Sequence, residues 1–199
     1  MMLSERFDEA MNLALQLHRQ QLRKGKGVPY ISHLLAVTAI VLEQGGDEDQ
    51  AIAAMLHDAA EDQGGQPTLD AIRRQFGDRV ADMIASLSDA MPMPGQDKAP
   101  WRRRKEAYLG HLHDALPEVL LISAADKIAN ARDILGDVRA QGPSALDRFK
   151  GGRDGTLWYY RQIVETLSVT GPVALAQELD RVVTQLMNLA AAAPAVPAG

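Results

Sequence analysis

Residues 51–62, AIAAMLHDAAED, join an apolar run to a cluster of polar side chains. The run contains no polar residue before His57, which is typical of a buried helix. On a helix, His57 and Glu61 are one turn apart, and so are Asp58 and Asp62, so these side chains share one side. Acids near the carboxyl end of a helix are opposed by the helix dipole and by one another. A cation should therefore lie beside them, either a divalent metal ion or a basic loop of the chain.

Helical periodicity extends over the rest of the chain. Residues at spacings of three or four predict an amphipathic first helix with one apolar stripe, made of Phe7, Met11, Leu15, His18 and Leu22. Capping residues, glycines and prolines delimit further helices, predicted at 32–43, 47–61, 68–77, 78–90, 100–114, 117–135, 154–169 and 172–190, with a short helix or turn at 143–149. No stretch alternates cleanly at a period of two. We therefore predict an all-α, single-domain bundle of about nine helices over residues 1–190.

Composition narrows the class of protein. The length of 199 residues is that of one domain. The absence of cysteine excludes a disulfide framework, thiolate catalysis and iron–sulfur clusters. No signal-peptide pattern opens the chain, and the most apolar stretch, residues 34–42, falls short of the roughly 20 residues that span a membrane. We expect a cytoplasmic protein without a membrane partner. We predict that MPMPG at 91–95 is a loop and that 191–199 form a disordered, low-complexity tail.

The formal net charge of −5 conceals two basic clusters. Residues 19–26 hold four basic side chains and residues 98–105 hold five, and neither segment contains an acid. Duplex nucleic acid is normally bound by a broad basic face. Two compact clusters on an otherwise acidic chain favour a small polyanionic ligand and no nucleic acid. The alternative interpretation is two solvated surface segments. Nothing in the sequence specifies an oligomeric state.

Asp126 follows the apolar run 119–125, which predicts a buried helix. A buried carboxylate without a partner costs several kcal/mol or takes up a proton. Lys127 is adjacent, but successive helical residues face about 100° apart. Asn130 is one turn further along, on the same face, so Asp126 and Asn130 suggest a polar pocket.

The histidines separate into two groups. His33 opens a helix directly after a Gly-x-Pro-Tyr turn, so its position is restricted. His18 lies on the apolar stripe, and we expect a hydrogen-bonded core residue there, whereas His111 and His113 have a polar context typical of the surface. Two imidazoles and two carboxylates suit a first-row divalent ion such as Mn²⁺, Fe²⁺, Co²⁺ or Zn²⁺. The set consists of His33, His57, Asp58 and Asp126.

The candidate ligands lie in three longer motifs. These are Arg23-Lys24 with Gly27-Val28-Pro29-Tyr30-Ile31-Ser32-His33, then His57-Asp58-Ala59-Ala60-Glu61-Asp62, and Ala125-Asp126-Lys127-Ile128-Ala129-Asn130-Ala131-Arg132. They resemble motifs of the HD-domain metal-dependent phosphohydrolases, and most closely those of the hydrolase domain of the RelA/SpoT homologues, which remove the 3′-pyrophosphate from alarmones of the (p)ppGpp type. The resemblance covers about residues 7–170 and implies an HD-type helical bundle. Because no synthetase domain follows, the chain is similar to the stand-alone small alarmone hydrolases.

The resemblance also implies roles for individual residues. A metal ion, usually Mn²⁺, would be held by the four residues of the set above. Water activation and proton transfer would fall to Glu61 and Asp62. The nucleotide would be bordered by Arg23, Lys24 and Tyr30, with Asn130 and Arg132 on its sugar or phosphates. The products would be pyrophosphate and a nucleoside 5′-di- or triphosphate.

Two departures from the family pattern concern the substrate. Gln63-Gly64-Gly65 replaces a threonine-led turn, and the segment 91–108 is unlike that of the long enzymes. The base, guanine or adenine, therefore stays open, as in (p)ppGpp or (p)ppApp. Two other functions stay open as well. One is an HD phosphohydrolase acting on other nucleotides, and the other is a non-catalytic nucleotide sensor on the same fold.

Overall fold

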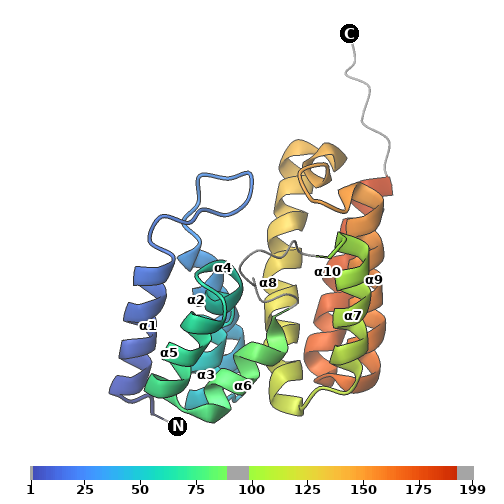
Figure 1. The fold of residues 1–199 in the computed structure, drawn as a ribbon. Helices are drawn as coiled ribbons and strands as arrows, with labels where there is room; N and C mark the ends of the chain where they lie inside the picture. The colour runs from blue at the N-terminus through green and yellow to red at the C-terminus, as the bar shows by residue number, and fades with distance from the viewer. Residues whose placement is uncertain (1, 89–98, 192–199) are drawn as a thin grey trace.

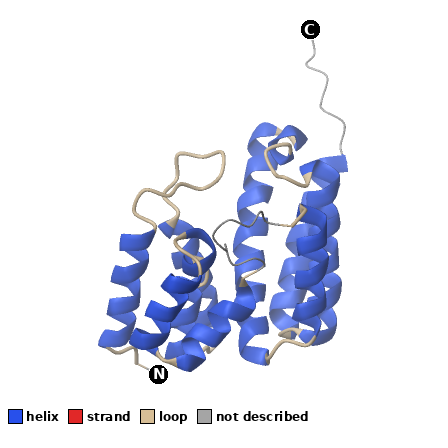
Figure 2. Cartoon of the chain, in the orientation of Figure 1, coloured by secondary structure: helices blue, strands red, loops and turns tan. Residues whose placement is uncertain are grey.

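The structure, a computed structural model, describes residues 2–88 and 99–191, which form helices, turns and one isolated antiparallel β-bridge between Leu22 and Pro29 (Figure 2). The prediction of an all-α bundle is confirmed. The predicted loop at 91–95 and all but the first residue of the predicted tail lie outside the described residues. The helices of the described ranges are α1 (Glu5–Leu17), α2 (Ile31–Glu43), α3 (Glu48–Leu56), α4 (Ala59–Asp62), α5 (Gln66–Phe76), α6 (Asp78–Leu87), α7 (Trp101–His113), α8 (Pro117–Gln141), the 3₁₀ helix η1 (Pro143–Leu146), α9 (Gly152–Thr170) and α10 (Val173–Ala191).

Helix α8 runs through the middle of the molecule (Figure 1). Helices α2, α3 and α6 pack against it on one side, and α9 and α10 pack against it on the other, while α7 packs on α9. One buried apolar cluster includes side chains from Phe7 in α1 to Ala190 in α10. Because both halves of the chain pack on α8, a polar residue at its centre, such as Asp126, can meet side chains from each half.

The first helix differs from its prediction. Its buried face consists of Phe7, Ala10 and Ala14, whereas Leu15 is 42% exposed. The small alanine side chains allow α1 to pack closely on α3, so the alanine face is buried and the larger Leu15 is not. The helix also ends at Leu17, and the chain turns before Leu22, which is exposed.

Several helix ends differ from the predicted ones. Asp47 caps α3 as predicted, in a capping box with Gln50. Ser32 lies inside the first turn of α2, where its hydroxyl donates to the Pro29 carbonyl oxygen instead of capping the helix. Helix α5 begins at Gln66, directly after Gly65, whose φ of 68° is one that glycine adopts readily. Helix α8 continues to Gln141, beyond the predicted end near 135, because Gly142 with a φ of 78° is the residue that terminates it.

The predicted helix at 47–61 is interrupted. Helix α3 ends at Leu56, and the short α4 begins at Ala59. The Nδ1 of His57 donates to the carbonyl oxygen of Ala54, at 2.8 Å. In a continuous helix that carbonyl would accept from the Asp58 N–H. The side chain of His57 thus competes for the backbone acceptor at the point where the helix is interrupted.

Candidate metal centre and active site

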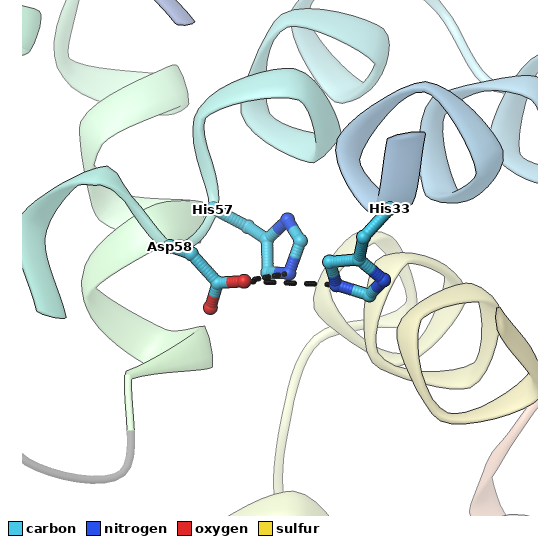
Figure 3. A group of neighbouring side chains, drawn as sticks. All are labelled: His33, His57 and Asp58. Carbon is cyan, nitrogen blue, oxygen red and sulfur yellow. Dashed lines mark ion pairs between the residues drawn. The ribbon is translucent and has the colours of Figure 1, made fainter. Parts of the chain in front are cut away.

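Three of the four predicted metal ligands meet at one point. Ligand atoms of His33, His57 and Asp58 all lie within 4.8 Å of one another, and Figure 3 shows the side chains converging from α2 and from the turn between α3 and α4. The Oδ2 of Asp58 is 3.0 Å from the Nε2 of His57 and 3.6 Å from the Nε2 of His33. The fourth residue, Asp126 of α8, joins the group, with its Oδ1 3.2 Å from the Nε2 of His33.

The hydrogen bonds of the histidines leave nitrogen atoms available to an ion. Because a carbonyl oxygen can only accept, the Nδ1 of His57 carries the proton in its contact with Ala54, and its Nε2 faces the carboxylates. The Nε2 of His57 and both ring nitrogens of His33 are buried and have no hydrogen-bond partner among the described residues. Unpartnered buried nitrogens beside two carboxylates fit a divalent ion.

The charges of the group are strongly coupled. Burial lowers the pKa of His57, but Asp58 and Asp126 outweigh it and hold that pKa well above its usual value. Burial raises the pKa of Asp58 and of Asp126, while His57 lowers the first and Lys127 lowers the second, so both remain well below their usual range. The carboxylates are therefore charged, as metal ligands must be.

Asp126 has two further partners on its own helix. The amide of Asn130 donates to its Oδ1 at 2.6 Å, as the one-turn spacing predicts. The ammonium group of Lys127 contacts its Oδ2. Lys127 reaches Asp126 although successive helical residues face about 100° apart, because a long lysine side chain can bend back to a neighbour.

A cavity of about 140 Å³ adjoins the metal centre and is lined by His57, Asp58 and Asp126. A second cavity, of about 450 Å³, shares six lining residues with the first, so the two are parts of one cleft. The shared residues are Tyr30, Glu61, Lys105, Lys127, Asn130 and Tyr159. Seven basic side chains line the larger part, against the carboxylates of Glu61 and Asp133. The cleft is therefore strongly cationic and suits a polyanion.

Most of the predicted substrate residues line this cleft. Arg23, Lys24, Tyr30 and Asn130 border the larger cavity. The hydroxyl of Tyr30 donates to the Oδ2 of Asp58 at 2.5 Å, and burial together with that carboxylate raises the pKa of Tyr30. The guanidinium of Arg23 donates to the Oδ1 of Asn130 at 2.8 Å.

The two predicted catalytic acids are placed differently. Glu61 lines both parts of the cleft, next to the metal centre. Asp62 is not among the lining residues, and its Oδ2 accepts a hydrogen bond from Gln21 at 2.7 Å. Arg132 also lies outside the cleft, where it forms an ion pair with Glu178 of α10.

Other histidines are placed as expected. His18 is buried, and its Nδ1 hydrogen-bonds the Oε1 of Gln21 at 2.7 Å. His111 and His113 are exposed on α7. Of the five histidines, therefore, only His33 and His57 serve the metal centre.

The basic segment 98–105 contributes to the cleft. Trp101, Arg104 and Lys105 line it, which agrees with the favoured interpretation of the basic clusters as contacts for a small polyanionic ligand and not with the alternative of a merely solvated segment. Sequence reasoning assigned no role to four other residues of the cleft. Lys127, Arg148, Lys150 and Tyr159 also line it. In the sequence, Arg148 belongs to a short basic stretch that also contains Lys150. The sequence does not show where this stretch lies, and only the fold brings it to the cleft.

Two histidines and two carboxylates beside a basic cleft, in a bundle of helices, are typical of a metal-binding domain whose cleft suits a polyanion. The family model described as HD domain matches residues 10–148. The guanosine-3′,5′-bis(diphosphate) 3′-pyrophosphohydrolase MESH1 of Xenopus tropicalis is 34% identical over 129 residues, covering 63% of this chain and 68% of that protein. Human MESH1 is 33% identical over the same shares.

A solved structure gives the same result. It is described as a metazoan ortholog of SpoT that hydrolyzes ppGpp, and it matches with a TM-score of 0.75 and 26% identity over 94% of this chain and 98% of its own. The chain therefore belongs to the HD-domain family, in the group of MESH1 and SpoT-like hydrolases. The resemblance drawn from the three motifs is confirmed, and the HD domain implies a divalent metal, for which His33, His57 and Asp58 offer a site. Among the described residues, no helix is both long and apolar enough to span a membrane.

Proposed function

We propose that this chain hydrolyses the 3′-pyrophosphate of an alarmone nucleotide, (p)ppGpp or (p)ppApp, to pyrophosphate and a nucleoside 5′-di- or triphosphate. The observation that carries the proposal is the cationic cleft that adjoins a buried site with two histidines and two carboxylates. The reaction is the one printed in the names of the MESH1 relatives. A cytoplasmic location belongs to the same proposal.

The four residues His33, His57, Asp58 and Asp126 would hold the ion, which we propose to be Mn²⁺. When bound, such an ion lowers the pKa of water and polarises a phosphoryl oxygen. Tyr30 holds the Asp58 carboxylate in place through its hydroxyl, and Asn130 does the same for Asp126. These two hydrogen bonds orient the carboxylates before substrate arrives.

The side chains around the reacting phosphorus have separate tasks. The oxygen of a water molecule attacks the phosphorus attached to the ribose 3′-oxygen, and Glu61 accepts the proton. The bond between phosphorus and the 3′-oxygen breaks, the 3′-oxygen takes up a proton, and pyrophosphate leaves. The role of Asp62 as that proton donor stays a prediction, because its carboxylate contacts Gln21 outside the cleft. Lys105 and Lys127 neutralise the developing charge on the phosphates.

Product analysis tests the proposal. The protein loaded with Mn²⁺ is incubated with ppGpp and ppApp, and the products are separated by anion exchange. Equal amounts of pyrophosphate and of GDP or ADP are expected. Release of inorganic phosphate alone would indicate a different HD phosphohydrolase. Binding without turnover would indicate a nucleotide sensor, and either result would overturn the proposal.

A further inference from the structure

Two basic side chains approach the ring of Phe149, which lines the larger cavity of the cleft but not the smaller one. The Nζ of Lys24 is 5.7 Å from the ring centroid of Phe149, and the guanidinium carbon of Arg148 is 4.7 Å from it. Lys150 is the next residue in the chain. All three line the larger cavity and none lines the smaller one, which holds the metal ligands. We call Lys24, Arg148 and Lys150 the distal basic rim.

Other basic residues of this region are already neutralised by carboxylates. Arg23 pairs with Asp133 at 3.1 Å, and Lys26 pairs with both Asp133 and Asp137. In the rim itself, Arg148 contacts Asp137.

Lys24 and Lys150 differ from these residues. Neither has a hydrogen bond or ion pair with any described residue. The Nε of Arg148 is buried and has no hydrogen-bond partner among the described residues either. The rim thus presents two uncompensated positive charges to the cleft, which is the chemistry of an anion site.

We propose that the distal basic rim binds the 5′-phosphate groups of the nucleotide while its 3′-pyrophosphate lies at the metal centre. This inference rests on the proposed function, which places the 3′-pyrophosphate in the smaller cavity. Lys105 and Lys127 line both cavities and serve that end. A neutral base gains little from two uncompensated cations, whereas a 5′-diphosphate is multiply charged. The rim therefore makes the enzyme selective for substrates that carry 5′-phosphates.

Comparing two substrates isolates the rim. The 5′-diphosphate substrate is ppGpp, and guanosine 3′-diphosphate with a free 5′-hydroxyl has the same reacting end. For Lys150→Ala we expect KM to rise about tenfold for ppGpp, the lower range for a charge-assisted contact. For the 5′-hydroxyl substrate, KM should change less than about twofold, and kcat should stay near wild type for both substrates. Lys150→Arg should restore most of the KM for ppGpp, because it keeps the charge.

Arg139→Ala is the matched control. It removes one positive charge from an exposed position of α8 that hydrogen-bonds Gln185 and lines neither cavity. The KM and kcat for both substrates should stay near their wild-type values in this variant. Lys150 is exposed, so thermal unfolding should show that Lys150→Ala folds normally.

An equal KM increase for both substrates, or none for either, would overturn the rim as the 5′-phosphate site. Calorimetric binding of GDP gives a second measurement that needs no turnover, and Lys150→Ala should weaken it about tenfold. If GDP binds through Lys150 but ppGpp releases no pyrophosphate, the proposed function fails and the rim stands. If ppGpp is hydrolysed with a KM that is independent of the 5′-phosphates, the rim fails and the function stands.

Discussion

Replacing Asp137 by asparagine should destabilise the fold by about 3 kcal/mol. Asp137 is 7% exposed, and its carboxylate contacts Lys26 at 2.6 Å and also Arg148. The two cationic side chains are themselves only 18% and 17% exposed. Asparagine keeps the shape of the side chain but removes the charge. Lys26 and Arg148 would then be left partly buried, each without this partner.

The magnitude follows from the burial of the partners. Breaking a buried ion pair from one side costs about 3–5 kcal/mol. The lower value applies, because Lys26 retains Asp133 at 2.5 Å and some water reaches both cations. In a domain of this size, 1 kcal/mol corresponds to about 2–4 °C in Tm, so the expected decrease is about 6–12 °C.

The assay is thermal and urea unfolding followed by far-UV circular dichroism. Asp180→Asn is the matched control, since Asp180 is 49% exposed, its partner Arg161 is 45% exposed, and a pair this exposed contributes about 1 kcal/mol or less. An Asp137→Asn variant that loses less than about 1 kcal/mol would refute the reasoning, because the carboxylate would then contribute no more than a surface pair.

Four other predictions follow from the structure. Glu61→Gln should lower kcat by about 10²- to 10⁴-fold and leave the metal content unchanged. Steady-state kinetics and metal analysis test this prediction, and a variant that kept more than half of its kcat would contradict it. Chelation should abolish hydrolysis and Mn²⁺ should restore it. Because Asp58 and Asp126 raise the pKa of His57 in the metal-free protein, a metal ion competes with a proton for its Nε2. The affinity for Mn²⁺ should therefore increase with pH. Calorimetry in two buffers of different ionisation enthalpy should detect the released proton as a difference between the two binding enthalpies, and identical binding enthalpies would contradict the prediction. Asp47→Ala removes the cap that accepts from the Gln50 N–H at 3.0 Å and should cost about 1 kcal/mol in urea unfolding, with Asp49→Ala, two residues past the cap, as a comparison.

The metal centre could be predicted from sequence because each ligand has a distinctive local context. His33 follows a rigid turn, and His57-Asp58 ends an apolar run. Asp126 follows another apolar run, where a buried carboxylate requires a compensating partner. The structure brings all four together. Helix periodicity likewise predicted most helices, since their apolar faces pack on α8.

The distal end of the cleft could not be predicted in the same way. Arg148 reaches it because the chain reverses after α8 through η1, and its partner Asp137 lies one turn beyond Asp133 on that helix. Neither residue has a motif, and both belong to the site only through tertiary packing. Exposure of Leu15 has the same origin, because the neighbours of α1, not its periodicity, decide which face is buried.

The break between α3 and α4 was missed, and it lies at two of the predicted metal ligands, His57 and Asp58. Successive residues of a continuous helix face about 100° apart. In the structure, the Nε2 of His57 lies 3.0 Å from the Oδ2 of Asp58. The contact from His57 to the Ala54 carbonyl oxygen both fixes the proton on Nδ1 and occupies the acceptor that would continue the helix. Both residues keep backbone angles in the right-handed helical region, so the interruption lies in the hydrogen-bond pattern, which the apolar periodicity of the sequence does not reveal.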